Sequence, residues 1–296
     1  MLKSINVISG IQRYENATNR AFWQEMFAHM RGKPAQLLSF ETVKARLRLH
    51  EESYKGLQDI PLKNIVGSVG RYQDFTRTFL PRNVVSKDRW SRIYAETLDG
   101  MGLPPIEVYQ LGDVYFVRDG NHRVSVAREL GQKTIQAYVT AVDIPFCLQR
   151  ERIDQQVDAA EAYMTFMDET GLRYLPQHEN LMLSEPTRYN DLIGHLNLHR
   201  DVLSLMENRE ITLQDAALHW YENVYLPAVM LMRQYMILEH AKGRTETDMY
   251  LWLVDHLCEL EQCYEGQIND LTPALVSFLQ SRKLPVPEEL LEPVCE

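Results

Sequence analysis

Apolar residues in the first 50 positions recur every three to four residues, which is the spacing of one helix face. Residues 16–30 follow this pattern closely and are predicted to form a helix. Gly32 and Pro34 come directly afterwards, and both residue types end helices. Residues 40–47 repeat the pattern, with Phe40, Val43 and Leu47 on one side. The chain is therefore expected to begin with helices.

Between residues 60 and 142 the pattern changes to short runs of alternating apolar and polar residues, which is typical of strands. Residues 88–98 have helical spacing instead, and Gly112 with Asp113 marks a hairpin turn. The pattern predicts a compact α+β unit with a small mixed sheet. Its expected strands begin near residue 60 and include 106–109, 114–117 and 134–142, with a helix at 124–130 that Gly131 ends.

Beyond residue 145 helical spacing continues to the end of the chain. We therefore expect three regions: N-terminal helices at 1–57, the α+β unit at 58–145 and an all-helical domain at 146–296. The expected helices of the last region span 150–170, 189–207, 212–241, 246–265 and 273–282.

The composition is that of a globular protein with a sizeable core, since 45% of the 296 residues are apolar and 24% are charged. No apolar run reaches the about 18 residues that a membrane span needs, and the first ten residues do not look like a secretory signal. The four cysteines contain no Cys-x-x-Cys pair, which argues against a disulfide framework or a thiolate zinc site. We expect a soluble cytoplasmic protein with no membrane partner. The cysteines are Cys147, Cys258, Cys263 and Cys295.

Charge is distributed unevenly along the chain. The formal net charge is −10, and residues 151–296 hold 10 Lys and Arg against 26 Asp and Glu. Residues 1–133 are slightly cationic in contrast. Because an acidic surface repels polyanions, we expect a phosphate or nucleic-acid site in the first half. Solvated helix faces are the simpler explanation of the acidic half.

Residues 115–127 combine a strand, a glycine turn and the start of a helix. The free N–H groups and the dipole at a helix start favour anions. Gly120 would let a ligand approach the backbone, and Arg123 is suited to a bidentate phosphate contact. The alternative is a plain strand–turn–helix junction in which Arg123 pairs with a local acid such as Asp119.

The sequence of residues 119–127, DGNHRVSVA, resembles the signature of the ParB/sulfiredoxin superfamily. Residues 60–66, 71–75, 104–108 and 132–139 resemble further segments of that superfamily in the same order, so the resemblance covers about residues 58–143. Residues 66–80, 219–227 and 243–253 are also similar to an uncharacterised bacterial ParB-like family. That similarity implies that the helical half belongs with the α+β unit.

The superfamily includes CTP-hydrolysing DNA clamps, an ATP-dependent sulfinic acid reductase and a free-serine kinase. The resemblance therefore implies a ParB/sulfiredoxin-like fold and a nucleotide-binding protein, namely a phosphotransferase or nucleotidase that uses ATP or CTP with Mg²⁺. Sulfiredoxins carry a cysteine where this chain has Asn121, which argues against sulfiredoxin chemistry. The implied nucleotide ligands are Arg71, Gly120, Asn121, His122, Arg123 and Val124, the catalytic residues Asp119 and His122, and the Mg²⁺ ligands Asp74 and Asp119.

Two other functions stay open on the sequence. Arg71, Arg77 and Arg82 lie in one loop-like stretch and would suit a DNA-binding regulator or a partition-type protein, although local ion pairs explain them equally well. The third option is a non-catalytic interaction module, with a protein partner on the acidic helices. A homodimer is compatible with each of the three functions.

The helical half contains two further clusters. Asp191, His195 and His199 are spaced four residues apart on one helix face, which would suit zinc, but no distant ligand is evident and a structural role is favoured. The aromatic cluster at residues 219–225 is predicted to pack in a core rather than to stack on a base.

Overall fold

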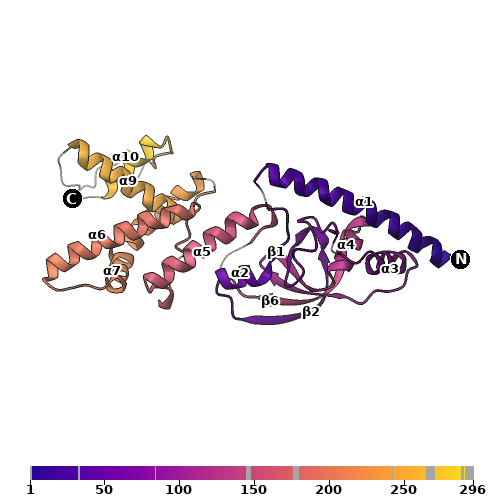
Figure 1. The fold of residues 1–296 in the computed structure, drawn as a ribbon. Helices are drawn as coiled ribbons and strands as arrows, with labels where there is room; N and C mark the ends of the chain where they lie inside the picture. Colours follow the sequence, from indigo (N-terminus) through magenta and orange to yellow (C-terminus); the bar gives the residue numbers. More distant parts are fainter. Residues whose placement is uncertain are drawn as a thin grey trace. The chain divides into compact units, whose positions relative to one another are not determined.

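The computed structural model describes residues 2–32, 34–83, 85–144, 148–175, 180–241, 243–264, 271–287 and 290. The predicted α+β class is confirmed, because an N-terminal helix and a six-stranded mixed sheet precede a mostly helical region (Figure 1). The chain divides into two compact units, Met1–Val157 and Asp158–Glu296. The boundary expected at residue 145 falls on residues 145–147, outside the described residues.

The helices and strands of the first unit are α1 (Leu2–Met30), β1 (Leu38–Ser39), α2 (Phe40–Arg46), β2 (Glu52–Pro61), β3 (Ile65–Ser68), α3 (Lys87–Leu98), β4 (Ile106–Leu111), β5 (Val114–Asp119), α4 (Asn121–Glu129) and β6 (Thr134–Val142). The strand order is β1-β3-β5-β4-β6-β2. As the Gly112–Asp113 turn predicts, β4 and β5 form an antiparallel hairpin. β6 is parallel to β4 and antiparallel to β2, while β3 is parallel to β5 and to β1.

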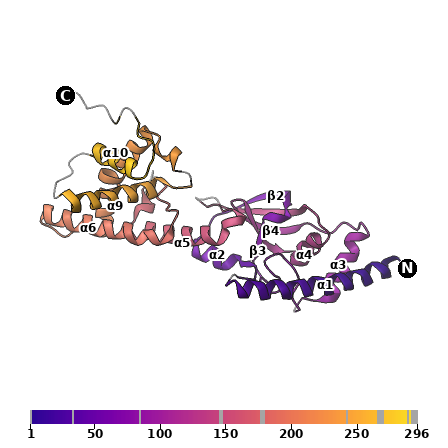
Figure 2. The same ribbon diagram turned by 90° about the horizontal axis from the view of Figure 1, so that it is seen from above.

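One face of the sheet packs against α1, α3 and α4. Trp90 of α3 is fully buried and shares a core cluster with Val108 of β4, and its Nε1 donates to Ser125 Oγ of α4 at 2.9 Å. α1 runs along α3 (Figure 2), with the Tyr14 and Trp90 ring centroids 5.8 Å apart. The Tyr14 hydroxyl also donates to the Val85 carbonyl at 2.7 Å. These contacts fix the position of α4 relative to the sheet.

The opposite face of the sheet is covered in part by α2. Phe40 of α2 stacks on Tyr109 of β4 with ring centroids 4.4 Å apart. Farther along this face, toward β6 and β2, Tyr138 and Tyr54 are 41% and 66% exposed. The sheet therefore presents two solvent-accessible aromatic side chains on the side away from α4.

Several elements of the first unit differ from the prediction. β1 was not predicted, and α4 begins at Asn121 rather than at residue 124. α1 begins at Leu2 rather than at residue 16, and its Gly10 packs so closely on α3 that an added Cβ would lie 2.8 Å from the Ser91 carbonyl oxygen. β2 begins at Glu52, although the sequence indicates a strand only near residue 60. Most β2 residues are exposed at the edge of the sheet and Gly56 follows a bulge, so the strand lacks a clear alternation of apolar residues.

The second unit is helical, as predicted. One predicted helix, 212–241, is wrong as a continuous element. The described residues form a π-helical turn at Tyr221–Tyr225 after α7, and the chain leaves helical geometry at Met236, whose φ is 49°. The helices are α5 (Ile153–Glu169, which crosses the division between the units), α6 (Tyr189–Glu207), α7 (Leu213–Trp220), α8 (Leu226–Gln234), α9 (Glu246–Tyr264) and α10 (Leu271–Ser281).

The aromatic cluster of the second unit packs in its core, which confirms the prediction. Trp220, Tyr221 and Tyr225 are at most 3% exposed. Trp220 Nε1 donates to the Tyr250 hydroxyl of α9 at 2.8 Å. His219, at the start of the cluster, is exposed instead. These rings join α7, the π-helical turn and α9.

Within the described residues, no helix is long and apolar enough to cross a membrane. Cys258 is an exposed free thiol. Cys147 and Cys295 lie outside the described residues, as does the side chain of Cys263.

Candidate anion-binding site

The start of α4 follows directly from the end of β5. Gly120 links the two elements with a φ of 112°, a value that favours glycine, and an added Cβ there would lie 2.5 Å from Ile106 Cγ2. The first helical hydrogen bond runs from the Val124 N–H to the Gly120 carbonyl at 3.0 Å. The N–H groups of residues 121–123 precede that bond and have no acceptor within the part of the chain that the structure describes. Free N–H groups at a helix start are suited to an anion.

A cavity of about 310 Å³ opens at this helix start. It brings together six of the predicted site residues: Arg71, Asp119, Gly120, Asn121, His122 and Arg123. Arg89 from α3 and Arg118 from β5 also line the cavity, although neither is among the predicted site residues. Arg89 lies 33 positions before His122 in the sequence, so only the packing of α3 on α4 reveals that both face one cavity.

The side chains around the cavity are predominantly cationic. Arg71 has a carboxylate of Asp74 at 4.0 Å, and Arg118 has one of Glu107 at 3.7 Å, both at the outer limit of an ion pair. Arg89 has no ion-pair partner among the described residues. Arginine side chains with weakly held partners are available to an anionic ligand.

Arg123 is held by the protein itself. Its Nη1 donates to the carbonyls of Pro104 at 2.5 Å and Pro105 at 2.8 Å, and its Nη2 pairs with Asp119. The Arg123 side chain is only 14% exposed. The structure thus contains the local Arg123–Asp119 pair that the sequence offered as the alternative to a phosphate contact. Arg123 positions the loop before β4 and the end of β5.

His122 and Asn121 are buried with polar atoms that lack partners. The residues are 5% and 8% exposed, and His122 Nε2 and Asn121 Oδ1 have no hydrogen-bond partner among the described residues. Asn121 Nδ2 donates to the Gly70 carbonyl at 3.3 Å. An unpartnered buried polar atom costs stability unless a ligand or water satisfies it. Both residues line the cavity, although these two atoms are themselves shielded from solvent.

The electrostatics of the cavity keep His122 neutral at pH 7. Burial, together with the smaller effects of the positive charges on Arg89 and Arg71, lowers the pKa of His122 to about 4, whereas Asp119 opposes the shift. A neutral imidazole next to several arginines does not repel an anion through its own charge, but the arginines attract one. The cavity is therefore suited to a multiply charged anion.

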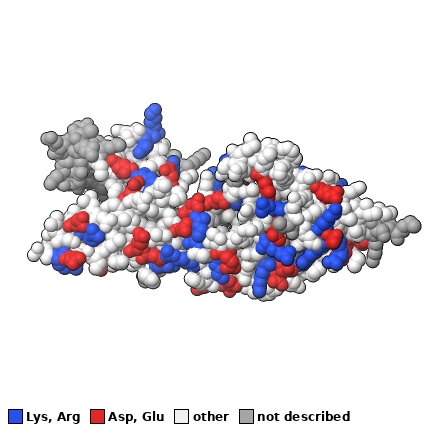
Figure 3. Space-filling view, viewed as in Figure 1, with Lys and Arg blue, Asp and Glu red and all other residues white. Residues whose placement is uncertain are grey.

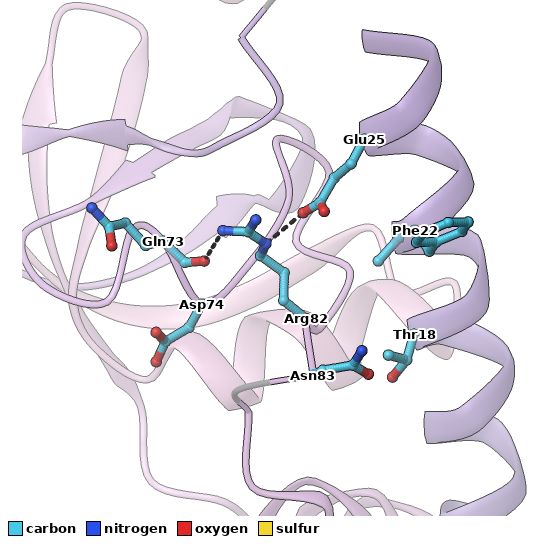
Figure 4. A pocket seen from close by; sticks show the side chains of 8 residues that line it. Thr18, Phe22, Glu25, Gln73, Asp74, Arg82 and Asn83 are labelled. Carbon is cyan, nitrogen blue, oxygen red and sulfur yellow. Dashed lines mark hydrogen bonds and ion pairs between the residues drawn. The ribbon is translucent and has the colours of Figure 1, made fainter. Parts of the chain in front are cut away.

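Two predicted site residues lie elsewhere. The Val124 N–H is used in the first hydrogen bond of α4 and its side chain is fully buried in the core, so its N–H is not free for the predicted phosphate contact. Asp74 lines a second cavity, of about 330 Å³, between α1 and the loop after β3 (Figure 4). In that cavity Arg82 Nε lies 2.5 Å from Glu25 Oε1, and Arg82 Nη1 donates to the Gln73 carbonyl.

The structure does not place the predicted Mg²⁺ ligands Asp74 and Asp119 in one cavity. Within the described residues there is no group of three or more His, Cys, Asp or Glu side chains that could hold a metal ion. In the second unit, Asp191 pairs with Arg188 at 2.9 Å, and His199 Nε2 lies 2.9 Å from His219 Nδ1. Asp191 and His199 therefore have protein partners, in line with the structural role favoured for that cluster.

The remaining arginines of the predicted DNA-binding loop are also engaged. Arg77 lies 2.5 Å from a carboxylate oxygen of Asp154, and Arg82 pairs with Glu25. On the face drawn in Figure 3, Lys and Arg side chains are interspersed with Asp and Glu. The described side chains of the first unit on that face form no continuous cationic surface of the kind on which duplex DNA binds.

Comparison of the chain with protein-family models and with curated proteins finds no match. The resemblance to the ParB/sulfiredoxin superfamily stays a prediction from the sequence.

Proposed function

We propose that this chain is a cytoplasmic nucleotide-binding protein of ParB/sulfiredoxin type that holds the phosphates of ATP or CTP at the start of α4. One observation carries the proposal. Residues 121–123, whose N–H groups are free, and the three arginines at positions 71, 89 and 118 all line one cavity.

Each part of this arrangement supports a polyphosphate over a single small anion. Backbone N–H groups at a helix start bind one phosphate group. Arg71, Arg89 and Arg118 come from three different parts of the chain and surround that point. Several arginines around one set of free backbone N–H groups complement a polyphosphate, which carries negative charge on consecutive phosphate groups.

We extend the proposal to phosphoryl transfer or nucleotide hydrolysis with Mg²⁺. Asp119 is the one carboxylate among the residues that line the cavity, and one or two carboxylates together with phosphate oxygens suffice for Mg²⁺. Bound Mg²⁺ would neutralise phosphate charge during transfer. Asp119 and the neutral His122 are the side chains of this cavity that can accept a proton from an attacking hydroxyl or water.

The test is calorimetric titration of the full chain with ATP and CTP, with and without Mg²⁺, comparing Arg89→Ala with Arg92→Ala. Both arginines are exposed on α3, one turn apart, but only Arg89 is among the residues that line the cavity. Removing one phosphate-contacting arginine should weaken binding roughly tenfold. Arg92→Ala should leave the affinity within about twofold, because it removes the same charge from the same helix.

Absence of binding of both nucleotides to the wild-type protein would refute the proposal. Equal losses in Arg89→Ala and Arg92→Ala would show a general effect of charge instead of a site. Phosphate release in the presence of Mg²⁺ is the assay for turnover. Titration with duplex DNA at low salt tests the DNA-binding alternative, since such binding must weaken steeply as salt rises.

A further inference from the structure

A third cavity, of about 350 Å³, adjoins the candidate phosphate site on the sheet face away from α4. Its walls come from β2, β4, β5 and β6, and no residue of α4 is among them. Two tyrosines, Tyr54 and Tyr138, line it and are more than 40% exposed. Its remaining lining residues are Glu107, Val108, Arg118 and Thr140.

Arg118 joins this cavity to the phosphate site, because its side chain lines both of them. The two cavities meet at the open end of the β4–β5 hairpin, opposite its turn, where Glu107 is the cross-strand partner of Asp119. The Arg118 side chain is 58% exposed, and the nearest carboxylate oxygen of Glu107 is 3.7 Å away. A ligand can therefore extend from the helix start, past Arg118, onto the face of the sheet.

We infer that the tyrosine-lined cavity takes the base of the nucleotide whose phosphates bind at the start of α4, and that it prefers bases with an amino group. This inference rests on the proposed function. Aromatic side chains on an exposed sheet stack on nucleobases, and such stacking tolerates different bases. Tyr54 and Tyr138 supply rings for that purpose on adjacent strands.

Glu107 supplies the preference among bases. A carboxylate accepts a hydrogen bond from an exocyclic amino group, such as that of cytosine or adenine. The corresponding position of uracil is a carbonyl oxygen, which a carboxylate repels. Thr140 adds a hydroxyl to the same cavity, and hydroxyls both donate and accept hydrogen bonds. The cavity therefore favours ATP and CTP over UTP.

A fourth cavity, of about 260 Å³, lies on the other side of Arg123 and is less suitable for the base. No aromatic side chain is among its lining residues. Arg123 stands between that cavity and the phosphate site, and it is fixed there by the Pro104 and Pro105 carbonyls and by Asp119. Arg118 is more exposed than Arg123, so the path from the phosphate site to the tyrosine-lined cavity is more open than the path past Arg123.

The experiment titrates the full chain with ATP, CTP, UTP and inorganic triphosphate, for the wild type, Tyr138→Ala, Tyr54→Ala and the control Leu57→Ala. Leu57 is exposed and pairs with Tyr138 across the strands, but it does not line the cavity. Loss of a stacking ring should weaken ATP and CTP binding roughly tenfold. Triphosphate binding should stay within about twofold, because it has no base to stack.

Glu107→Gln tests the preference among bases, because the amide keeps the size of the side chain and removes its charge. The ratio of CTP to UTP affinity should fall in this variant while triphosphate binding persists. Unchanged ATP and CTP affinities in both tyrosine variants, with nucleotide and triphosphate still bound, would overturn the inference and leave the proposed function standing. If the wild type binds neither nucleotide nor triphosphate, the proposed function and this inference fail together.

Discussion

The neutral, buried state of His122 leads to a prediction about how stability depends on pH. Burial holds the pKa of His122 at about 4 in the folded protein, whereas an unfolded histidine titrates near 6.5. Below pH 6.5 the unfolded chain therefore binds a proton that the folded chain does not. The stability contributed by this group is fully present above pH 6.5 and is lost as the pH falls toward 4.

The size of the effect follows from these two pKa values. Between pH 7.5 and pH 5, His122 should lower the free energy of unfolding by about 2 kcal/mol. Water in the cavity screens part of this effect, so about 1–2 kcal/mol is expected. Arg89 and Arg71 contribute to the shift as well, hence Arg89→Ala should raise the pKa of His122. A bound polyphosphate should also raise it, because negative charge favours the imidazolium.

Two measurements test this reasoning. NMR titration of ¹³C-labelled histidines gives the pKa of His122 directly, with His122→Gln to assign its signal. Urea unfolding of the wild type and of His122→Gln at pH 7.5 and 5 gives the loss of stability that is due to His122. The other histidines are present in both proteins, so their contribution drops out when the two pH dependences are subtracted. A His122 pKa near 6.5, or the same pH dependence in both proteins, would show that the cavity does not desolvate this side chain.

Two further substitutions test the local structure around the site. Gly120→Ala should destabilise the first unit by about 2–4 kcal/mol, because it combines a φ of 112° with a Cβ placed 2.5 Å from Ile106 Cγ2. Gly131→Ala is the control, because its φ is 71° but no atom lies within 4 Å of the added Cβ. It should lower the free energy of unfolding by only about 1 kcal/mol. Urea denaturation compares the two, and equal losses would contradict the steric argument. Tyr14→Phe should lower the free energy of unfolding by about 1 kcal/mol, because the buried Val85 carbonyl loses its 2.7 Å hydrogen bond. A thermal unfolding curve that matches the wild type would show that water replaces the hydroxyl.

The sequence by itself determined the elements whose signals are local. The hairpin of β4 and β5, the glycine turn before α4 and the last strand, β6, all follow from alternation and turn residues within a few positions of one another. The helix start of the candidate site is of the same kind, since Gly120 and the free N–H groups after it depend only on neighbouring residues. α6 also begins and ends at the predicted residues, because its apolar spacing is regular.

Elements with weak or conflicting local signals were missed. β2 is an exposed edge strand with a bulge at Gly56, so burial imposes no alternation on it. The predicted helix at 212–241 has helical spacing throughout, yet a π-helical turn and Met236 in the left-handed region divide it. A periodic pattern cannot reveal such breaks, because the residues on either side still face the same core.

Only the tertiary structure decided which side chains form the site. Arg89 reaches the cavity because α3 packs on α4, and Arg118 because β5 ends beside Glu107 of β4. Arg123, the most obvious phosphate ligand in the sequence, is instead bound to its own chain through Pro104, Pro105 and Asp119. A local pattern fixes the backbone geometry of a turn, but the partners of a long charged side chain depend on segments far away in the sequence. Those segments meet only when the sheet and its covering helices have packed.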